Sequence, residues 1–309
     1  MSTLSVKRSL SLGVLMFALG VWTPSSASAA HPASIHFHEP WSVAVGPGGD
    51  IYVADRCNYR VVHLSSTGGF IGSWGGFSHQ DANGGPMGIT TDRTGNVYAS
   101  DPGNGRVIEF SPEGKQIMTF GEPGSGPGEL LVPVGVGVDA LGSVYVADAL
   151  NNRIEKFARD GGSIGSWGGP GDGPGQFEHP FVIALDESGN VYVSDHRGGR
   201  IEKFTSDGKF LRQWGQIGRG SGQFFLPFGL AIDASSHLCV ADELNARVQE
   251  FTPDGKLLSV FGSRGSRNSM FSDPSGIAVS PTGTIYVVDQ MRNSIVTLSP
   301  AHRVLGTWR

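Results

Sequence analysis

Short apolar runs, each interrupted by glycine, proline, aspartate or asparagine, recur along the whole chain. One stretch that shows the pattern contains runs at residues 181–186, 190–195, 200–204 and 210–214. The pairs Gly189-Asn190 and Asp207-Gly208 between these runs are typical of tight hairpin turns, and β-branched and aromatic residues fill the runs themselves. The pattern therefore predicts four short antiparallel strands in succession.

The same pattern returns at a spacing of 46 or 47 residues, which divides the chain into six repeats. Three kinds of residue keep this spacing: the prolines Pro40, Pro86, Pro133, Pro180, Pro227 and Pro274; the aspartates Asp55, Asp101, Asp148, Asp195, Asp242 and Asp289; and the aromatic residues Trp74, Phe120, Trp167, Trp214, Phe261 and Trp308. A fixed period means that each repeat is one structural module, and a module of four antiparallel strands is typical of a propeller blade. We predict an all-β, six-bladed β-propeller with four antiparallel strands per blade, the blades covering about residues 35–74, 75–120, 121–167, 168–214, 215–261 and 262–309.

The order of strands within a repeat predicts how the ring is built and closed. The first strand is rich in small residues, as at residues 229–232, which suits a crowded axis. The aromatic residue that ends the fourth strand would fill the diverging space between blades at the outer edge. Because the chain begins an inner strand after Pro40 and ends an outer strand at Trp308, no strand remains for exchange between blades. We expect packing between blades one and six, with residues 35–39, to close the ring.

Residues 1–30 have the features of a secretory signal peptide. Lys7 and Arg8 precede an apolar run at residues 10–22, and Ala27-Ser28-Ala29 supplies the small residues of a cleavage site. The run is too short to span a bilayer as a helix. We therefore expect a mature domain of residues 31–309 that is secreted or periplasmic, monomeric and not inserted in a membrane.

Charge and cysteine content narrow the classes of function. Without its first 30 residues the chain has 21 Lys and Arg against 28 Asp and Glu, a net charge of −7, which disfavours nucleic acid as a partner. Cys57 and Cys239 fall in repeats one and five, which are not neighbours in a ring of six, so we expect no disulfide. Cys239 occupies a column otherwise filled by tyrosine, which predicts a core position, whereas Cys57 is a candidate exposed thiol.

Two segments of the fourth repeat, Gly-Asn-Val-Tyr-Val-Ser-Asp at 189–195 and Gly-Gly-Arg-Ile-Glu-Lys-Phe at 198–204, resemble the NHL repeat. Residues 144–148 and 151–157 of the third repeat do the same, and the resemblance extends over all six units. The chain is thus similar to exported NHL-repeat propellers of the bacterial type. Such propellers include ligand-binding sensor domains, RNA-binding modules and the metal-dependent lyase that completes peptide C-terminal amidation, so the resemblance implies the fold and leaves the function open.

The NHL family's Asp-x-x-Asn-x-Arg element carries a charge pair in four blades: Asp55 and Arg60, Asp101 and Arg106, Asp148 and Arg153, Asp242 and Arg247. Asp195 and Arg200 form a fifth pair, although Gly198 replaces the asparagine there. Blade six has Arg292 and Ser294 where asparagine and arginine are expected, and lacks the usual cation unless Arg292 turns back toward Asp289. A pair found in five blades is best explained as a structural, charge-assisted bond that holds the loop between strands two and three. The asparagine suits a left-handed backbone.

Function should lie where the repeats differ, on the face shared by the loops that lead into each blade and the loops that join strands two and three. The residue after each repeated proline is the most variable: Trp41, Met87, Val134, Phe181, Phe228 and Ser275. These side chains would either ring a central depression or pack beneath the loops. The predicted ligand site consists of Trp41, Met87, His179, Phe181, His196, Arg197, Phe228 and Arg292.

Histidines are the candidate metal ligands. His38 and His179 belong to opposite blades and could face each other across the channel, which resembles the histidine-lined channel of the amidating lyase. They lack compact zinc-ligand spacing, so we expect no cofactor, with zinc or calcium as the alternative. His63, His237 and His302 fall on strand or opposite-face positions and look incidental.

Together these observations predict an extracytoplasmic binding scaffold that recognises a peptide, protein or glycan on its variable loop face, without catalytic residues. The alternative is a metal-dependent lyase of the peptidyl-amidoglycolate lyase type, or a hydrolase, acting in the central channel.

Overall fold

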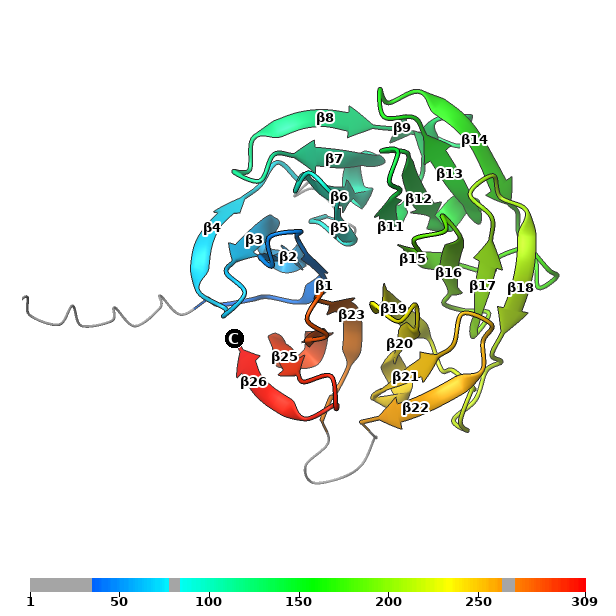
Figure 1. Cartoon of the computed structure of the whole chain (residues 1–309). Helices are drawn as coiled ribbons and strands as arrows, with labels where there is room; N and C mark the ends of the chain where they lie inside the picture. Colours follow the sequence, from blue (N-terminus) through cyan, green and yellow to red (C-terminus); the bar gives the residue numbers. More distant parts are fainter. Residues whose placement is uncertain (1–34, 78–83, 263–269) are drawn as a thin grey trace, which may run out of the picture. The chain divides into compact units, whose positions relative to one another are not determined.

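Six four-stranded sheets follow one another around a ring in the computed structural model (Figure 1). The structure describes residues 35–77, 84–262 and 270–309, all within the unit Pro32–Arg309, and the predicted signal peptide at residues 1–30 lies outside the described residues. In each of the six sheets the strand order follows the sequence. The predicted six-bladed propeller with four antiparallel strands per blade is confirmed.

The strands of each blade run from the innermost to the outermost. Blade one comprises β1 (Pro40–Val45), β2 (Ile51–Asp55), β3 (Arg60–Leu64) and β4 (Phe70–Trp74); blade two, β5 (Ile89–Thr91), β6 (Val97–Asp101), β7 (Arg106–Phe110) and β8 (Gln116–Phe120); blade three, β11 (Pro133–Val138), β12 (Val144–Asp148), β13 (Arg153–Phe157) and β14 (Ser163–Gly168). Blade four comprises β15 (Pro180–Leu185), β16 (Val191–Asp195), β17 (Arg200–Phe204) and β18 (Phe210–Trp214); blade five, β19 (Pro227–Ile232), β20 (Leu238–Asp242), β21 (Arg247–Phe251) and β22 (Leu257–Phe261); blade six, β23 (Pro274–Val279), β24 (Ile285–Asp289), β25 (Ser294–Leu298) and β26 (Val304–Trp308).

Shorter elements fill the loops between these strands. A parallel pair, β9 (Glu122–Pro123) and β10 (Glu129–Leu130), lies between blades two and three. Single 3-10 turns follow the second strand in five blades: η1 (Arg56–Asn58), η2 (Pro102–Asn104), η3 (Ala149–Asn151), η4 (Glu243–Asn245) and η5 (Gln290–Arg292). Within the described residues, no helix is long and apolar enough to cross a membrane.

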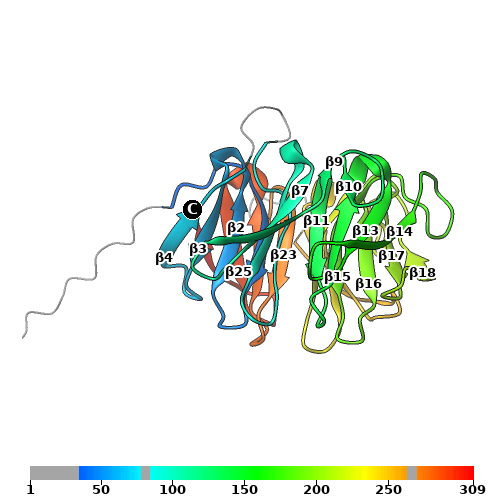
Figure 2. The ribbon, with the colours of Figure 1, turned by 90° about the horizontal axis from the view of Figure 1, so that it is seen from above.

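The inner strands approach one another so closely that small residues are required. A Cβ atom on Gly88 would lie 2.2 Å from the carbonyl oxygen of Val134 in the next blade. Ser100 bridges the same two blades, because its hydroxyl donates to Val134 O and accepts the N–H of Gly88, both at 2.8 Å. Figure 2 shows neighbouring strands such as β11, β15 and β16 side by side along the ring. The predicted crowding at the axis is confirmed.

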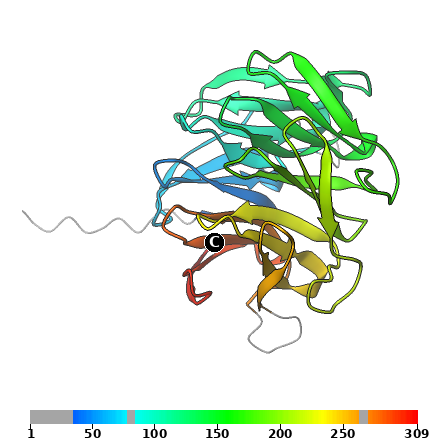
Figure 3. The same cartoon turned by 45° about the vertical axis from the view of Figure 1, so that its right-hand side comes forward.

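Aromatic residues at the ends of the outer strands pack against the following blade, as predicted. The ring centroid of Trp74 lies 6.1 Å from that of Phe110. A Cβ atom on Gly114 would come within 2.6 Å of the Trp74 indole. Trp167 makes the same contacts with Phe204 and Gly208. Figure 3 shows the ring obliquely, with the outer edge of blades three and four, in green to yellow-green, toward the viewer.

Ring closure rests on side chains, as predicted, since each blade keeps its own four strands. Val43, Val53 and Leu64 of blade one share a core with Val288 and Ile295 of blade six. The preceding segment contributes Phe37, which is 5% exposed, and the backbone N–H of Glu39 donates to Asn293 Oδ1 of blade six at 2.8 Å. In Figure 1 the end of β26 lies beside blade one.

The five repeated charge pairs hold the loops together. The distance from the arginine nitrogen to the aspartate oxygen is 2.7 Å in Asp55–Arg60, 2.9 Å in Asp101–Arg106, 3.3 Å in Asp148–Arg153, 3.0 Å in Asp195–Arg200 and 2.7 Å in Asp242–Arg247. Each aspartate is fully buried. The other oxygen of Asp195 accepts the N–H of His179 at 2.8 Å, so one carboxylate ties the hairpin to the loop that leads into the blade. This geometry is that of the predicted structural bond.

The prediction that the asparagine takes a left-handed backbone is wrong by one residue. The left-handed residue is the next one, as at Tyr59, with φ 54°, and Ala246, with φ 52°. Asn58 instead ends the 3-10 turn and donates to Asp55 Oδ2 at 2.8 Å. The asparagine is thus a third partner of the buried carboxylate.

Blades four and six satisfy the carboxylate differently. In blade four a Cβ atom at Gly198 would lie 2.3 Å from Asp195 Oδ2, and Arg200 contacts both Asp195 and Glu202, each at 3.0 Å. In blade six Arg292 turns back, with Nη1 3.3 Å from Asp289 Oδ2. The cation missing from the blade six hairpin is therefore supplied by Arg292.

Candidate functional site

The side chains that follow the repeated prolines close one end of the channel. We call this end the proline face; it carries the loops that lead into each blade and the 3-10 turns. Met87, Val134, Phe181 and Phe228 are 3–7% exposed and pack together with Trp41, which is partly buried. The sequence left two alternatives for these side chains: a ring around an open central depression, or packing in the interior. The structure shows that they are packed.

Trp41 reaches across the mouth of the channel from blade one to blades four and five. Its ring centroid lies 5.9 Å from that of Phe181 and 5.4 Å from that of Phe228, and the two phenylalanines meet edge to face at 4.8 Å. Edge-to-face contacts place the positive ring edge against the negative ring face. Residues from three blades thus form one aromatic cluster.

His196 extends this cluster toward the surface. Its imidazole stacks on Phe181 at 4.3 Å with an interplanar angle of 17°. Its Nε2 lies 3.0 Å from Glu243 Oε2, so that the imidazole of blade four donates to a carboxylate of blade five. The position of His196 is therefore set by both a ring contact and a polar contact.

His179 lies beside these two residues, with its ring centroid 5.3 Å from that of Phe181. Burial, together with the positive charges of Arg197 and His196, lowers the pKa of His179 to about 4. The imidazole is therefore neutral at pH 7. Its Nδ1 is buried without a hydrogen-bond partner among the described residues, as is the indole nitrogen of Trp41.

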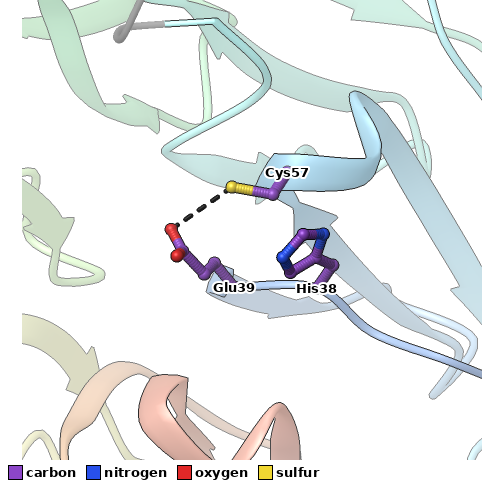
Figure 4. A group of neighbouring side chains, drawn as sticks. All are labelled: His38, Glu39 and Cys57. Atoms are coloured by element: carbon purple, nitrogen blue, oxygen red, sulfur yellow. Dashed lines mark hydrogen bonds between the residues drawn. The ribbon is translucent and has the colours of Figure 1, made fainter.

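His38, Glu39 and Cys57 form a group on blade one at the same face (Figure 4). Their ligand atoms all lie within 4.8 Å of one another, and the Cys57 thiol donates to Glu39 Oε2 at 3.2 Å. Burial, and the hydrogen bond to Glu39, raise the pKa of the Cys57 thiol. The structure places His38 with this group and His179 with Phe181 and His196, so the two predicted metal ligands belong to separate clusters.

Two of the predicted arginines differ in their surroundings. Arg197 is exposed beside His196, where a ligand can reach it. Arg292 is engaged by Asp289 and also donates to Met270 O at 3.1 Å, which places it in the scaffold of blade six. Arg56, which was not predicted, lies over the Trp41 ring at 4.7 Å and contacts Glu39 at 3.4 Å.

Sequence reasoning missed Glu39, Arg56 and Glu243. Arg56 and Glu243 each stand directly after the repeated aspartate. The residue at this position varies between blades as much as the residue after the repeated proline, so the sequence already marked it as a candidate. The residues at this position are Arg56, Pro102, Ala149, His196, Glu243 and Gln290. Comparing His196 with its equivalents would have drawn attention to both Arg56 and Glu243.

Below the aromatic cluster, the channel holds a cavity of about 240 Å³ lined by the inner strands. At the opposite end, which we call the turn face, two further cavities of about 310 and 360 Å³ lie between the turns that join first and second strands. Carboxylates recur there at Asp92, Asp139, Asp186 and Asp233. Asp92 Oδ1 accepts the N–H groups of Thr94 and Asn96, so these carboxylates stabilise their own turns.

Comparisons with known proteins agree with this architecture. A model of the NHL repeat matches residues 37–64. A structure of streptogramin B lyase is 16% identical, with a TM-score of 0.65, and the match covers 90% of this chain and 85% of that one. An inactive virginiamycin B lyase from Staphylococcus aureus with quinupristin is 15% identical, with a TM-score of 0.64 and coverage of 90% and 86%.

A third similar structure is hydrazine synthase from Kuenenia stuttgartiensis, which is 10% identical with a TM-score of 0.62; the match covers 90% of this chain and all of that one. A search of curated proteins found no match. Because these identities are so low, the likeness shows the fold alone.

Proposed function

We propose that this six-bladed β-propeller, in which residues 37–64 match the NHL repeat, is a binding propeller whose proline face recognises a peptide, protein or glycan outside the cytoplasm. The aromatic cluster at the mouth of the channel is the main support. Rings from blades one, four and five meet there, and Trp41 and His196 remain partly exposed. Rigid aromatic side chains provide contact area at a small loss of rotamer entropy.

The polar groups around the cluster suit a ligand with both apolar and hydrogen-bonding parts. Trp41 and His179 each hold a buried nitrogen without a partner in the described chain, and Arg197 adds an exposed cation. A neutral His179 imidazole can accept a hydrogen bond at one nitrogen and donate at the other. Peptides and sugars offer such groups next to apolar surface.

The buried side chains of Met87, Phe181 and Phe228 would serve this site as its floor. They fix the position of Trp41 and His196 without needing to contact the ligand over their whole surface. Binding-site residues held by packing lose less entropy when a ligand binds. The site is therefore the partly exposed rim of a rigid core.

Export is part of the proposal and can be tested separately. If residues 1–30 direct secretion, the mature protein begins near Ala30 or His31 and is found outside the cytoplasm. Cell fractionation followed by N-terminal sequencing measures both. A full-length protein that stays in the cytoplasm would contradict the extracytoplasmic assignment.

Screening the mature domain against a displayed peptide library and a glycan array tests the binding function. We expect enrichment of one ligand class, with affinity reduced at least about 10-fold in Trp41→Ala and Arg197→Ala. Arg93→Ala, on the turn face, is the matched control and should bind as the wild type does. Equal loss in all three variants, or retention in all three, would contradict binding at the proline face.

A metal-dependent lyase is the second candidate, and the group of His38, Glu39 and Cys57 favours it. Imidazole, carboxylate and thiolate are all zinc ligands, and three protein ligands with an open position are typical of catalytic zinc. A bound ion there would polarise a carbonyl or activate a water. Zinc content after mild purification, compared between wild type and Cys57→Ser, separates the candidates: loss of one equivalent in the variant favours the lyase.

A further inference from the structure

On the turn face, three residues differ from those at the same position in the other repeats. Two of them lie in blade five, and the third lies in the neighbouring turn of blade six. Cys239 of blade five stands where the other blades have a tyrosine: Tyr52, Tyr98, Tyr145, Tyr192 and Tyr286. His237 of blade five stands where the other blades have a shorter polar residue: Asp50, Asn96, Ser143, Asn190 and Thr284. His302 of blade six stands where the other blades have a glycine: Gly68, Gly114, Gly161, Gly208 and Gly255.

Blade two shows what the usual residues do at this place. The Tyr98 hydroxyl lies between two carboxylates, 3.3 Å from Asp92 Oδ2 and 3.0 Å from Glu109 Oε1. Asn96 also donates to Glu109 at 2.9 Å. The phenol and the amide thus occupy the space between the carboxylates and satisfy them.

Blade five retains both carboxylates, as Asp233 and Glu250, but lacks the phenol. Cys239 is much shorter than tyrosine, and a cavity of about 70 Å³ opens beside it, lined by Asp233, Glu250 and His302 among others. Such a volume is larger than a single water molecule requires. Burial, with Glu250 and Asp233 nearby, raises the pKa of the Cys239 thiol, so Cys239 stays neutral.

His237 replaces the amide and lies between the carboxylates. Its Nδ1 is 3.3 Å from Asp233 Oδ2 and 3.2 Å from Glu250 Oε1. Both distances exceed the roughly 2.7–2.9 Å typical of a charge-assisted N–H···O hydrogen bond. They lie close to the ligand-to-ligand edge of about 3.3–3.6 Å that tetrahedral zinc imposes when its bonds measure about 2.0–2.2 Å, and the three ligand atoms all lie within 4.8 Å of one another.

The surrounding groups orient these ligands. Asp233 Oδ1 accepts the N–H groups of Ser235 and His237, both at 2.8 Å, which turns Oδ2 toward the imidazole. The Ser259 hydroxyl donates to Glu250 Oε2 at 2.8 Å. Hydrogen bonds of this kind fix the direction of metal ligands.

His302 comes from the neighbouring blade and adopts a backbone that is unfavourable for a residue with a side chain. Its φ is 60°, as suits the glycines that fill this column elsewhere. Its ring stacks on Phe261 at 4.0 Å, and its Nε2 lies 3.8 Å from Glu250 Oε2. Because this backbone costs free energy for a residue with a side chain, the contacts with Phe261 and Glu250 must hold His302 in place.

We propose that Asp233, His237 and Glu250 bind a divalent transition-metal ion, with Zn²⁺ as the best fit, and that His302 positions Glu250. Two carboxylates compensate the ionic charge, and the mixed nitrogen and oxygen set suits zinc better than calcium or magnesium. The ion joins the turn of blade five that holds Asp233 and His237 to the strand that holds Glu250, and Glu250 links it to His302 in the adjacent turn of blade six. It acts as a structural clamp next to the last blade of the ring.

Zinc titration of the chelator-treated mature protein tests the site, followed by calorimetry and thermal melts. We expect binding of Zn²⁺ at the turn face and a rise in Tm of about 5 °C or more at zinc concentrations about 100-fold above Kd. His237→Asn, which restores the residue of blades two and four, should lose one equivalent of zinc and this Tm rise. His302→Gly should keep the stoichiometry and weaken binding about 10-fold.

His63→Gln is the matched control, because His63 contacts a single carboxylate, Asp50, at 2.9 Å in blade one. It should bind zinc as the wild type does. Substitution of Co²⁺ for Zn²⁺ adds a readout, since a tetrahedral cobalt spectrum should form in wild type and vanish in His237→Asn. Wild-type zinc stoichiometry and Tm rise in His237→Asn would overturn the proposal, as would the absence of any zinc binding.

Discussion

The two ends of the channel use the same residue type, aspartate, in different ways. At the proline face, Asp195 is fully buried and accepts hydrogen bonds from His179, 16 residues away, while Arg200 contacts it from the next strand. At the turn face, Asp139 Oδ1 accepts N–H groups only two and four residues along the chain, from Leu141 and Ser143. The repeated aspartate of the proline face therefore joins segments that are distant along the chain, and the repeated aspartate of the turn face joins groups of its own turn.

This difference explains where variable residues can be displayed. Loops fixed by buried charge pairs keep their backbone position when their side chains change, so the proline face tolerates Trp41, Arg56 and Glu243 at positions that differ between blades. Turns that are stabilised locally fold independently of their neighbours.

Arg200→Ala should have the largest effect, about 3–5 kcal/mol off the free energy of unfolding, because it leaves Asp195 and Glu202 buried without their cation. Urea denaturation measures it. Arg106→Ala is the matched variant, and because the Arg106 side chain is 30% exposed, water can replace it and the loss should be smaller. Equal losses would show that burial of the pair is not what stabilises the proline face.

Phe181→Ala should destabilise the fold by about 3–4 kcal/mol, since it removes the ring on which Trp41, Phe228 and His196 all pack. A thermal melt checks this value. Ligand affinity should fall in the folded fraction because His196 loses its support. A variant with wild-type stability would mean that the aromatic cluster is not part of the core.

The pH dependence of stability should contain a contribution from Glu202. Burial raises its pKa to about 7, from an ordinary value near 4.5. The folded state therefore binds a proton more tightly than the unfolded state, and the stability from this group is complete below about pH 4.5 and lost as pH rises through about 7. We expect a decrease of about 3 kcal/mol across this window.

Glu202→Gln isolates that contribution, because blade five already has Gln249 in the same column, where it accepts the N–H of Gly222 at 2.9 Å. The variant should lose most of the decrease between pH 5 and pH 8 in urea melts. An unchanged slope would assign the pH dependence to other groups.

Asp139→Ala should have the smallest effect, about 1–2 kcal/mol, because the groups that lose their acceptor lie within six residues of Asp139. These groups are the N–H groups of Leu141 and Ser143 and the Tyr145 hydroxyl. Denaturation midpoints of the two aspartate variants Asp139→Ala and Asp195→Ala give the comparison directly. A larger loss in Asp139→Ala would reverse our interpretation of the two faces.

The sequence by itself determined the number of blades, the strands of each and the way the ring closes. A period of 46 or 47 residues repeats the same local preferences, so the strands of blade four, such as Arg200–Phe204 and Phe210–Trp214, could be read directly. The partners Asp195 and Arg200 could be paired for the same reason, because a spacing of five residues across the hairpin brings the equivalent pair together in five of the six blades. Repetition makes these contacts predictable.

Tertiary structure decided what the residues outside the repeat pattern do. Whether Phe181 is buried depends on Trp41, which reaches it from the opposite side of the ring. Glu243 contacts His196 from 47 residues away, and His302 reaches Glu250 from the next blade. Such contacts depend on how side chains of different blades fill one space, and a repeat pattern carries no information about positions at which the repeats differ.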